Sequence, residues 1–276
     1  SYRDKYNELI RNKSSFTMLL KPNYTKFNID GRLGNYTYNK KGFNYAFMGM
    51  LSQIKTDIRM NVARLGGIDK LPNYTHKNIR YCFYGKQLTR VLPEGVGKVV
   101  TYRDAVEFDI SKAYFKAALN LGYISEHVYE RCTDERIVPK KDRLKLLGAI
   151  ATQGELFRFV NGKEVGESRI ISDEALRRVW FHICKLVDDC LVQFSGAVKH
   201  GLYMYWVDGA IFKSECLKEA ESFMLYAAMR YNLEFKKVIV HKIEIKHNAS
   251  GALCIYVHKE NGVKEFMFPL GSSIKK

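Results

Sequence analysis

Long apolar runs and paired cysteines are both missing from this sequence of 276 residues. No stretch of about 18 or more consecutive apolar residues occurs, so we expect no helix that spans a membrane. Residues 1–5 contain no apolar signal region. None of the six cysteines belongs to a Cys-x-x-Cys pair, which argues against a zinc or redox site of that kind. We therefore expect a cytoplasmic protein whose cysteines are reduced and buried.

Acidic residues are also few, because 29 Asp and Glu stand against 45 Lys and Arg, which gives a formal net charge of +16. Residues 1–80 hold 15 of the basic residues and only 5 acidic ones, interleaved with aromatic side chains such as Tyr24, Phe27, Tyr36 and Tyr38. Basic groups bind phosphates and flat rings stack on bases, so nucleic acid is the expected partner. A solvated basic face over an aromatic core would give the same pattern.

The apolar content, 46% of the chain, is enough for a buried core and excludes general disorder. Helical periodicity is clearest over residues 45–64 and 173–194, whereas alternation predicts a strand at 105–110 and a short apolar run predicts one at 202–207. Tight turns between strands predict antiparallel hairpins. Ser125 is a candidate cap for a short helix that reaches Cys132. We therefore expect an α+β fold in which helices pack on an antiparallel sheet.

The expected organisation is one compact body with a basic extension at its N-terminus. Residues 1–42 are expected to be irregular because proline and glycine interrupt them. The extension covers residues 1–78 and contains one helix, and the sheet and its helices form a domain over residues 79–276.

Two aspartates are candidate catalytic residues because of their positions in strands. Asp109 lies near the end of a strand, and Asp208 lies at the tip of an apolar hairpin. Mg²⁺ typically binds one or two carboxylates together with substrate phosphates, and a pair of ions can clamp a phosphoryl transfer. Structural roles are equally compatible with these positions: Asp208 and Gly209 could simply form the turn, and Asp109 could cap the next helix. Asp188 and Asp189, in the long helix, are expected to face solvent.

A basic helix start is the second candidate site. Lys140, Lys141, Arg143 and Lys145 crowd the first turns of a predicted helix, and Lys141 and Lys145 share a face. Gly148 would allow close approach to this helix. A helix N-terminus with lysines could cradle a triphosphate, although a solvated basic turn would look the same.

Three segments, in this order, resemble motifs of the palm and fingers of family B DNA polymerases, and are more like the protein-primed phage branch than the cellular one. Residues 109–114, Asp-Ile-Ser-Lys-Ala-Tyr, are similar to the motif Asp-x-x-Ser-Leu-Tyr-Pro. Residues 143–147, Arg-Leu-Lys-Leu-Leu, look like the fingers motif. Residues 205–212, Tyr-Trp-Val-Asp-Gly-Ala-Ile-Phe, resemble the Tyr-Gly-Asp-Thr-Asp-Ser hairpin.

The resemblance implies a palm-like sheet with a defined set of site residues. Asp109 and Asp208 would be the catalytic metal ligands for Mg²⁺ (or Mn²⁺), and Tyr114 would lie under the sugar of the incoming nucleotide and exclude a 2′-hydroxyl. The remaining implied contacts are basic: Lys145, with Lys141 and Arg143, would bind the triphosphate, and Lys242 and Lys246 would lie on primer-gripping strands.

The sequence also departs from the family pattern. The fingers motif continues into residues 148–152, Gly-Ala-Ile-Ala-Thr, rather than Asn-Ser-x-Tyr-Gly, and the hairpin has one aspartate where the family has two. The chain has no room for a proofreading exonuclease or a full thumb, which a partner chain could supply. Such reduced proteins are associated, by resemblance only, with phages or other mobile elements that replicate DNA.

The leading expectation is therefore a DNA polymerase-like nucleotidyltransferase that adds nucleotides from nucleoside triphosphates to a DNA or RNA 3′ end by two-metal chemistry. Two alternatives stay open. One is a non-catalytic nucleic-acid-binding protein on a degenerate polymerase scaffold. The other is a nuclease that uses the same two aspartates.

Overall fold

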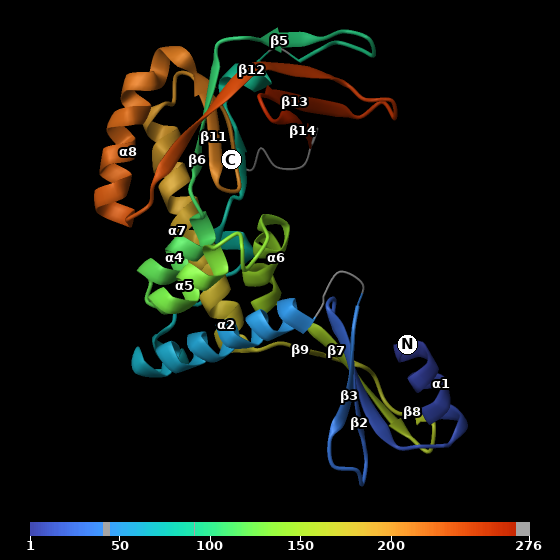
Figure 1. The fold of residues 1–276 in the computed structure, drawn as a ribbon. Coiled ribbons are helices and arrows are strands. Elements are labelled where there is room, and N and C mark those ends of the chain that lie inside the picture. Colours follow the sequence, from blue (N-terminus) through green and yellow to red (C-terminus); the bar gives the residue numbers. More distant parts are fainter. Residues whose placement is uncertain (41–44, 91, 269–276) are drawn as a thin grey trace. The chain divides into compact units, whose positions relative to one another are not determined.

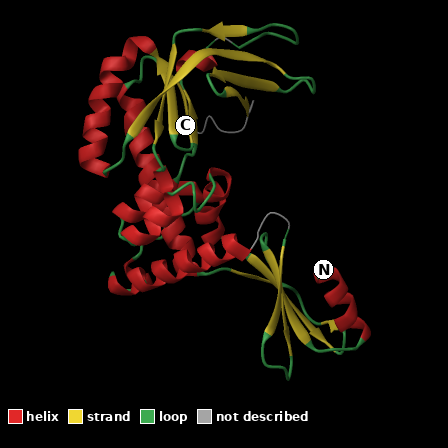
Figure 2. Cartoon of the chain, viewed as in Figure 1, coloured by secondary structure: helices red, strands yellow, loops and turns green. Residues whose placement is uncertain are grey.

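The computed structural model describes residues 1–40, 45–90 and 92–268 (Figures 1 and 2). Helices and antiparallel strands are mixed along the chain, which confirms the predicted α+β class. No helix in these three ranges is long and apolar enough to cross a membrane.

The chain divides into two compact units, and each is built from two separate stretches. The first unit contains Ser1–Asn73 and Leu121–His182, and the second contains Tyr74–Asn120 and Ile183–Lys276. This division differs from the expected boundary at residue 78. The reason is that the chain returns to its N-terminal part, where a strand from residues 154–160 pairs with a strand from residues 16–20.

The first unit contains a six-stranded antiparallel sheet in the order β3-β2-β1-β7-β8, with β9 also paired to β7. Its strands are β1 (Phe16–Leu20), β2 (Tyr24–Ile29), β3 (Asn35–Asn39), β7 (Gly154–Val160), β8 (Lys163–Glu164) and β9 (Arg169–Ile171). Helix α1 (Tyr2–Arg11) packs on this sheet, where Leu9, Phe16, Phe27 and Phe159 form a buried cluster.

The prediction of an irregular N-terminal segment with a single helix is therefore wrong for the described part of that segment. Pro22, Gly31 and Gly34 lie in the turns between short strands, which still satisfy one another's backbone hydrogen bonds, whereas Gly42 lies outside the described residues. Two of the aromatic residues considered for base stacking belong to the core, because Phe27 is fully buried and Tyr38 packs against it.

Three helices complete most of the first unit: α2 (Tyr45–Arg64), α5 (Glu126–Thr133) and α6 (Lys140–Ile150). The apolar stripe of α2 is buried, as its periodicity predicts, and α2 packs against α5 and α6. Ser125 caps α5 by accepting a hydrogen bond from the Val128 N–H, which confirms another sequence expectation. A short 3₁₀ turn, η1 (Ile68–Lys70), also lies in this unit.

The second unit is built around an eight-stranded antiparallel sheet in the order β14-β13-β12-β6-β11-β10-β4, with β5 also paired to β12. Its strands are β4 (Cys82–Tyr84), β5 (Val100–Tyr102), β6 (Ala105–Ile110), β10 (Leu202–Trp206), β11 (Gly209–Lys213), β12 (Phe235–His247), β13 (Leu253–Lys259) and β14 (Gly262–Met267). Its helical elements are η2 (His76–Asn78), α3 (Lys86–Thr89), α4 (Ala113–Asn120), η3 (Ser214–Cys216), α8 (Leu217–Tyr231) and the later part of α7 (Glu174–Ala197).

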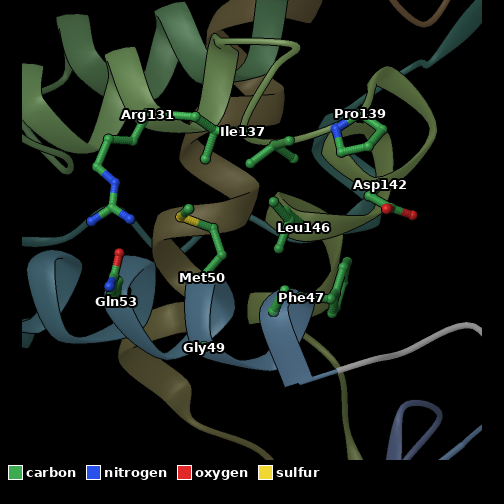
Figure 3. Close-up of a pocket in the computed structure, with 11 residues that line it drawn as sticks. Phe47, Gly49, Met50, Gln53, Arg131, Ile137, Pro139, Asp142 and Leu146 are labelled. Atoms are coloured by element: carbon green, nitrogen blue, oxygen red, sulfur yellow. The ribbon is translucent and has the colours of Figure 1, made fainter.

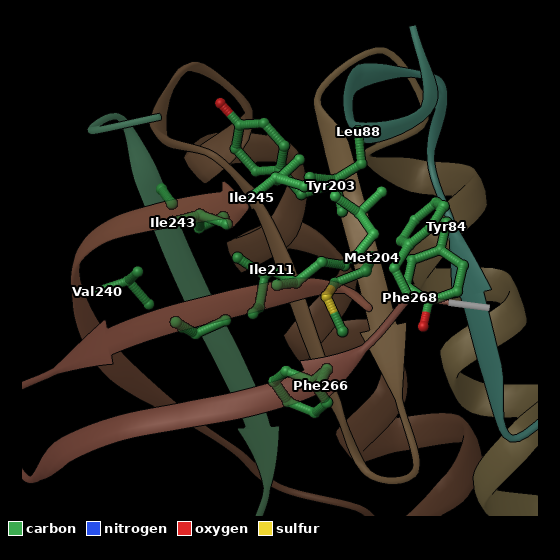
Figure 4. Close-up of a cluster of buried hydrophobic side chains, with 14 residues drawn as sticks. Tyr84, Leu88, Tyr203, Met204, Ile211, Val240, Ile243, Ile245, Phe266 and Phe268 are labelled. Carbon is green, nitrogen blue, oxygen red and sulfur yellow. The ribbon is translucent and has the colours of Figure 1, made fainter. Parts of the chain in front are cut away.

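Two apolar layers lie on the two faces of this sheet. On the face covered by helices, Phe108 and Phe212 of the central strands contact Phe194 of α7. On the other face, Met204 and Ile211 belong to a buried cluster with side chains of β12 to β14 (Figure 4). The sheet therefore curls, so that its last strands come over its own central strands, and the two aspartates lie at the edge of this second layer.

Candidate carboxylate site

The two candidate aspartates meet at one end of the central strands of the second unit. Strands β6 and β11 pair so that Gly209 lies opposite Asp109, and Asp208 directly precedes Gly209. The Ile110 N–H donates a hydrogen bond of 2.8 Å to the Asp208 carbonyl, which ties the hairpin to β6. Both side chains line the same small cavity. The structure thus brings together two residues that are distant in the sequence, while their role as metal ligands stays a prediction.

The turn that carries Asp208 differs from the expected one. Trp206 pairs with Gly209, so Val207 and Asp208 are the turn residues and Gly209 is already in β11. Val207 has a φ of 59°, a conformation that is strained for a β-branched residue. The Asp208 N–H donates a 2.7 Å hydrogen bond to the Trp206 carbonyl, which closes a γ-turn of the rare positive-φ kind.

A second turn of this kind lies beside the first. Tyr81 has a φ of 57°, and the Cys82 N–H donates to the Arg80 carbonyl at 2.6 Å. The Tyr81 carbonyl in turn accepts a 2.6 Å hydrogen bond from the Val207 N–H. Two strained turns therefore hold each other next to Asp208. Because backbone strain of this kind clusters at functional sites, the arrangement favours a function for Asp208 over a purely structural turn.

A third carboxylate, Glu107, lines the same cavity and was missed from the sequence. Glu107 is 6% exposed and forms an ion pair of 2.5 Å with Lys259 on β13. Its position on β6, two residues before Asp109, could have been recognised, because alternate residues of a strand share a face. A methyl group placed on Gly209 would lie 3.3 Å from oxygens of both Glu107 and Asp109, so the two carboxylates face the same small space.

Lysines accompany the carboxylates. Lys236 Nζ lies 3.0 Å from Asp109 Oδ2, and Lys264 lines the cavity with Asp208. Burial raises the pKa of Asp208 to about 6, and the nearby carboxylate of Asp109 adds to the shift, whereas the charges of Lys264 and Lys236 oppose it. Asp208 is therefore harder to ionise than a carboxyl group in water, and an additional cation close to it would lower its pKa again.

The cavity above the aspartates is small. It has a volume of about 10 Å³, which is room for roughly one water molecule. One side is formed by Trp206, whose ring centroid lies 5.0 Å from that of Phe266 on β14. A nucleotide does not fit between the aspartates and β14 in this conformation.

The donor set fits a hard cation only in part. Asp109 and Asp208 supply the carboxylate oxygens that Mg²⁺ prefers, and the ion usually takes its other ligands from water and substrate phosphates. Within residues 1–40, 45–90 and 92–268, no three or more His, Cys, Asp or Glu side chains are grouped so that they could hold a metal ion. The protein would thus supply two carboxylates at this pair, and the remaining ligands of the ion would be water or substrate phosphates.

Tyr114 lies close to the carboxylate pair. It belongs to the first turn of α4, directly after β6, and its side chain is half-buried. Burial raises the pKa of Tyr114, and the Cys184 thiol and the Asp208 carboxylate add to the shift. The structure therefore places the Tyr114 hydroxyl within electrostatic reach of Asp208, the neighbourhood that the resemblance implies.

The basic candidates of α6 belong to the first unit, whereas the aspartates belong to the second. Lys141 and Lys145 are exposed. Arg143 is engaged locally, because its guanidinium donates a 3.1 Å hydrogen bond to the Thr133 carbonyl and pairs with Glu135 at 3.2 Å. Their predicted contact with a triphosphate stays a prediction.

Another side of α6 lines a cavity of about 350 Å³ within the first unit (Figure 3). Its walls are mostly apolar, with Phe47 and Met50 from α2 and Leu146 from α6. The side chains of Arg131 and Gln53 lie near one another at one side of it (Figure 3). The exposed lysines of α6 do not line this cavity.

Lys242 and Lys246, the predicted nucleic-acid contacts, lie on β12 and share one carboxylate. Lys242 Nζ is 2.5 Å from Glu244 Oε1, and Lys246 Nζ is 3.4 Å from Glu244 Oε2. His258 Nε2 also lies 2.9 Å from Glu244 Oε2. The hydrogen bond from Lys242, with those from His258 and Lys246, lowers the pKa of Glu244 to about 2.

The prediction that Asp188 and Asp189 both face solvent is wrong for Asp188. Asp189 is partly exposed and pairs with Lys185 one helical turn away. Asp188 is 5% exposed, and burial raises its pKa. Its Oδ1 has no hydrogen-bond partner among the side chains and backbone that the structure describes. The segment around Arg80 and Tyr81, which the helical pattern cannot reveal, covers this part of α7.

No family model matches this chain, and no match was found among curated proteins.

Proposed function

We propose that the second unit carries a nucleotidyl-transfer centre that extends the 3′ end of DNA or RNA with nucleoside triphosphates. The observation that carries this proposal is the meeting of Asp109 and Asp208 on adjacent strands of one antiparallel sheet, beside two mutually bonded strained turns. The resemblance to family B palm motifs supports the same conclusion.

The site residues would have separate roles in metal binding and in nucleotide binding. Asp109 and Asp208 would hold Mg²⁺ (or Mn²⁺) together with the substrate phosphates. When bound, the ions supply charge neutralisation and a more nucleophilic 3′-hydroxyl. Tyr114 would shape the sugar pocket, because it follows β6 directly and lies near Asp208. Positioning and neutralisation dominate phosphoryl transfer, so a few residues suffice.

Primer extension with Mg²⁺ tests the proposal through Asp109→Asn and Asp208→Asn. Each substitution keeps the size of the side chain and removes the charge that would hold the ion. We expect each variant to lose extension by about a hundredfold or more, since charge stabilisation by a bound ion contributes several kcal/mol.

Asp189→Asn is the matched control, because Asp189 is a partly exposed aspartate of the same unit whose partner, Lys185, lies one helical turn away. Its extension rate should equal that of the unmodified protein. Extension at normal rates by both Asp109→Asn and Asp208→Asn would show that the site is assigned to the wrong residues.

A second candidate function is nucleic-acid binding without catalysis. It is favoured by the lysines that already neutralise Glu107 and Asp109, and by the hairpin at Asp208, which has one aspartate where the family has two. In that case the protein would bind nucleic acid in the presence of a chelator, and no extension would occur with Mg²⁺ or Mn²⁺.

A further inference from the structure

We propose that the β13–β14 hairpin (residues 253–267) is a strap that closes the carboxylate site, and that closure of the strap competes with binding of a divalent cation. This inference rests on the proposed site at Asp109 and Asp208. It adds a resting, closed state that neither the sequence motifs nor their resemblance implies.

The strap belongs to the sheet through the pairing of β13 with β12, and it shares a buried apolar cluster with Met204 and Ile211. Two further contacts fix it at the site. The Lys259 ammonium reaches the buried Glu107 carboxylate at 2.5 Å, which joins β13 to the strand that carries Asp109. Nearer the tip of the β10–β11 hairpin, Phe266 packs on Trp206 with ring centroids 5.0 Å apart. Phe266 itself is only 5% exposed, so this apolar contact is buried and excludes water from that side of the site.

The third component of the strap is a positive charge. Lys264 lines the cavity with Asp208, and its charge stabilises the ionised form of that carboxylate. Its Nζ also lies 4.9 Å from the centroid of the Phe266 ring, so the ring and the ammonium are held together. With the strap closed, an ammonium group therefore lies in the cavity lining together with Asp208.

Opening is required because the closed site has no room for substrates. The cavity of about 10 Å³ holds roughly one water, whereas chemistry at a 3′ end needs a nucleotide beside the aspartates. Strand β14 is at the edge of the sheet and, among the described strands, pairs only with β13, so it can leave without breaking the central strands.

A divalent cation at the aspartates would repel the ammonium of Lys264 and favour the open strap. If the cation binds the open state better, weakening closure raises the apparent affinity for the cation, by at most the factor by which closure is weakened. Phe266→Ala is the cleanest change, because it removes the contact with Trp206 and alters no charge.

The experiment measures Mn²⁺ affinity by electron paramagnetic resonance, without substrate, for Phe266→Ala and for Met267→Ala. Met267 is the matched control, since it neighbours Phe266 on β14 but is 68% exposed and does not line the cavity. We expect Phe266→Ala to bind Mn²⁺ about fivefold tighter or more, and Met267→Ala to bind it as the unmodified protein does.

A second measurement needs no change in the strap. The chain has two tryptophans, so a Trp180→Phe protein leaves Trp206 as the only one. Mg²⁺ should then increase the quenching of Trp206 fluorescence by acrylamide, because Phe266 moves away, and Asp208→Asn should abolish this response.

The two hypotheses fail in different ways. Unchanged Mn²⁺ affinity in Phe266→Ala, with no effect of Mg²⁺ on Trp206 quenching, would overturn the strap. Equal Mn²⁺ affinity in the unmodified protein, Asp109→Asn and Asp208→Asn would instead overturn the carboxylate site, and with it the proposed function.

Discussion

At the scale of single residues, two carboxylates of the second unit have pKa values shifted in opposite directions because their neighbours differ. Asp208 is buried beside another acid, so its pKa rises to about 6, whereas Glu244 accepts hydrogen bonds from two lysines and a histidine, so its pKa falls to about 2. In the first arrangement, burial and a neighbouring acid make the ionised carboxylate less stable than it would be in water. The second uses the same kind of group to hold two strands together.

Glu244 makes the stability of the protein depend on pH. Its folded-state pKa lies below its ordinary value of 4.5, so its contribution is fully present above about pH 4.5 and disappears as the pH falls toward about 2. We expect Glu244→Gln to lower the free energy of unfolding at neutral pH and to flatten its decline over this acidic range. Urea unfolding at about pH 7 and about pH 3 measures both effects.

The prediction for Glu244 would be contradicted if the free energy of unfolding fell equally steeply below about pH 4.5 in Glu244→Gln and in the unmodified protein. Glu215→Gln is a suitable control, because Glu215 is 60% exposed and its ion pair with Lys213 spans 3.7 Å. A pair of that kind contributes little to stability.

Residue-level prediction from sequence succeeded where a residue's strand decided its surroundings. The positions of Asp109 and Asp208 at the ends of an apolar strand and hairpin could be predicted from the residues, whereas only the resemblance implied that the two meet. The burial of Asp188 could not be predicted, because it depends on the segment around Arg80 and Tyr81, which is distant in sequence and reaches α7 only in the folded chain. The lysine partners of Glu107 and Asp109 come from β13 and β12, and are hidden from the sequence for the same reason.

At the scale of elements, two glycines differ in the space beside their backbones: Gly85 lies against a neighbouring strand, whereas Gly49 has open space beside it. Gly85, between β4 and α3, has an ordinary backbone conformation, and its N–H donates a 2.8 Å hydrogen bond to the Tyr203 carbonyl. A Cβ at this position would lie 1.9 Å from the Leu202 carbonyl oxygen. Gly49 of α2 is the opposite case, since a Cβ there would meet no atom within 4 Å in the described part of the chain.

The pair Gly85→Ala and Gly49→Ala tests this difference with one and the same chemical change. Gly85→Ala should destabilise the protein by about 3 kcal/mol or more, because the backbones of β4 and β10 must separate. Gly49→Ala should stabilise it by about 0.5–1 kcal/mol, because alanine favours the helix and fits the space. Chemical denaturation measures both, and a small loss in Gly85→Ala would contradict the close approach.

Elements that carry their own signal were predictable. The apolar stripe of α2 and the serine cap of α5 are local features, and both elements occur where the pattern placed them. Strands β1 to β3 were missed because they are short and complete their sheet only with β7 from residues 154–160. In addition, β2 and β3 are rich in Asn, Thr and Tyr. The turn at Val207 was misplaced by one residue because it uses a strained conformation that sequence preferences disfavour.

At the scale of the whole molecule, the excess of basic residues gives a prediction that does not depend on the carboxylate site. The formal net charge of +16 favours association with polyanions whether or not the carboxylates are active. Binding of single-stranded DNA in the presence of a chelator should therefore weaken by about tenfold or more between ~50 and ~200 mM salt. Fluorescence anisotropy with a labelled oligonucleotide measures this, and affinity that does not depend on salt would contradict an electrostatic interface.

The path of the chain between the two units has a consequence for how the protein is made. Because the chain passes from one unit to the other after residues 73, 120 and 182, neither unit is encoded by one uninterrupted stretch. A nascent polypeptide emerging from the ribosome would have to hold β1 to β3 unfinished until β7 is synthesised, and β6 until β11 follows. A cut between β3 and β7, or between β6 and β11, would therefore separate strands that need each other, and the protein is best produced and studied as one piece.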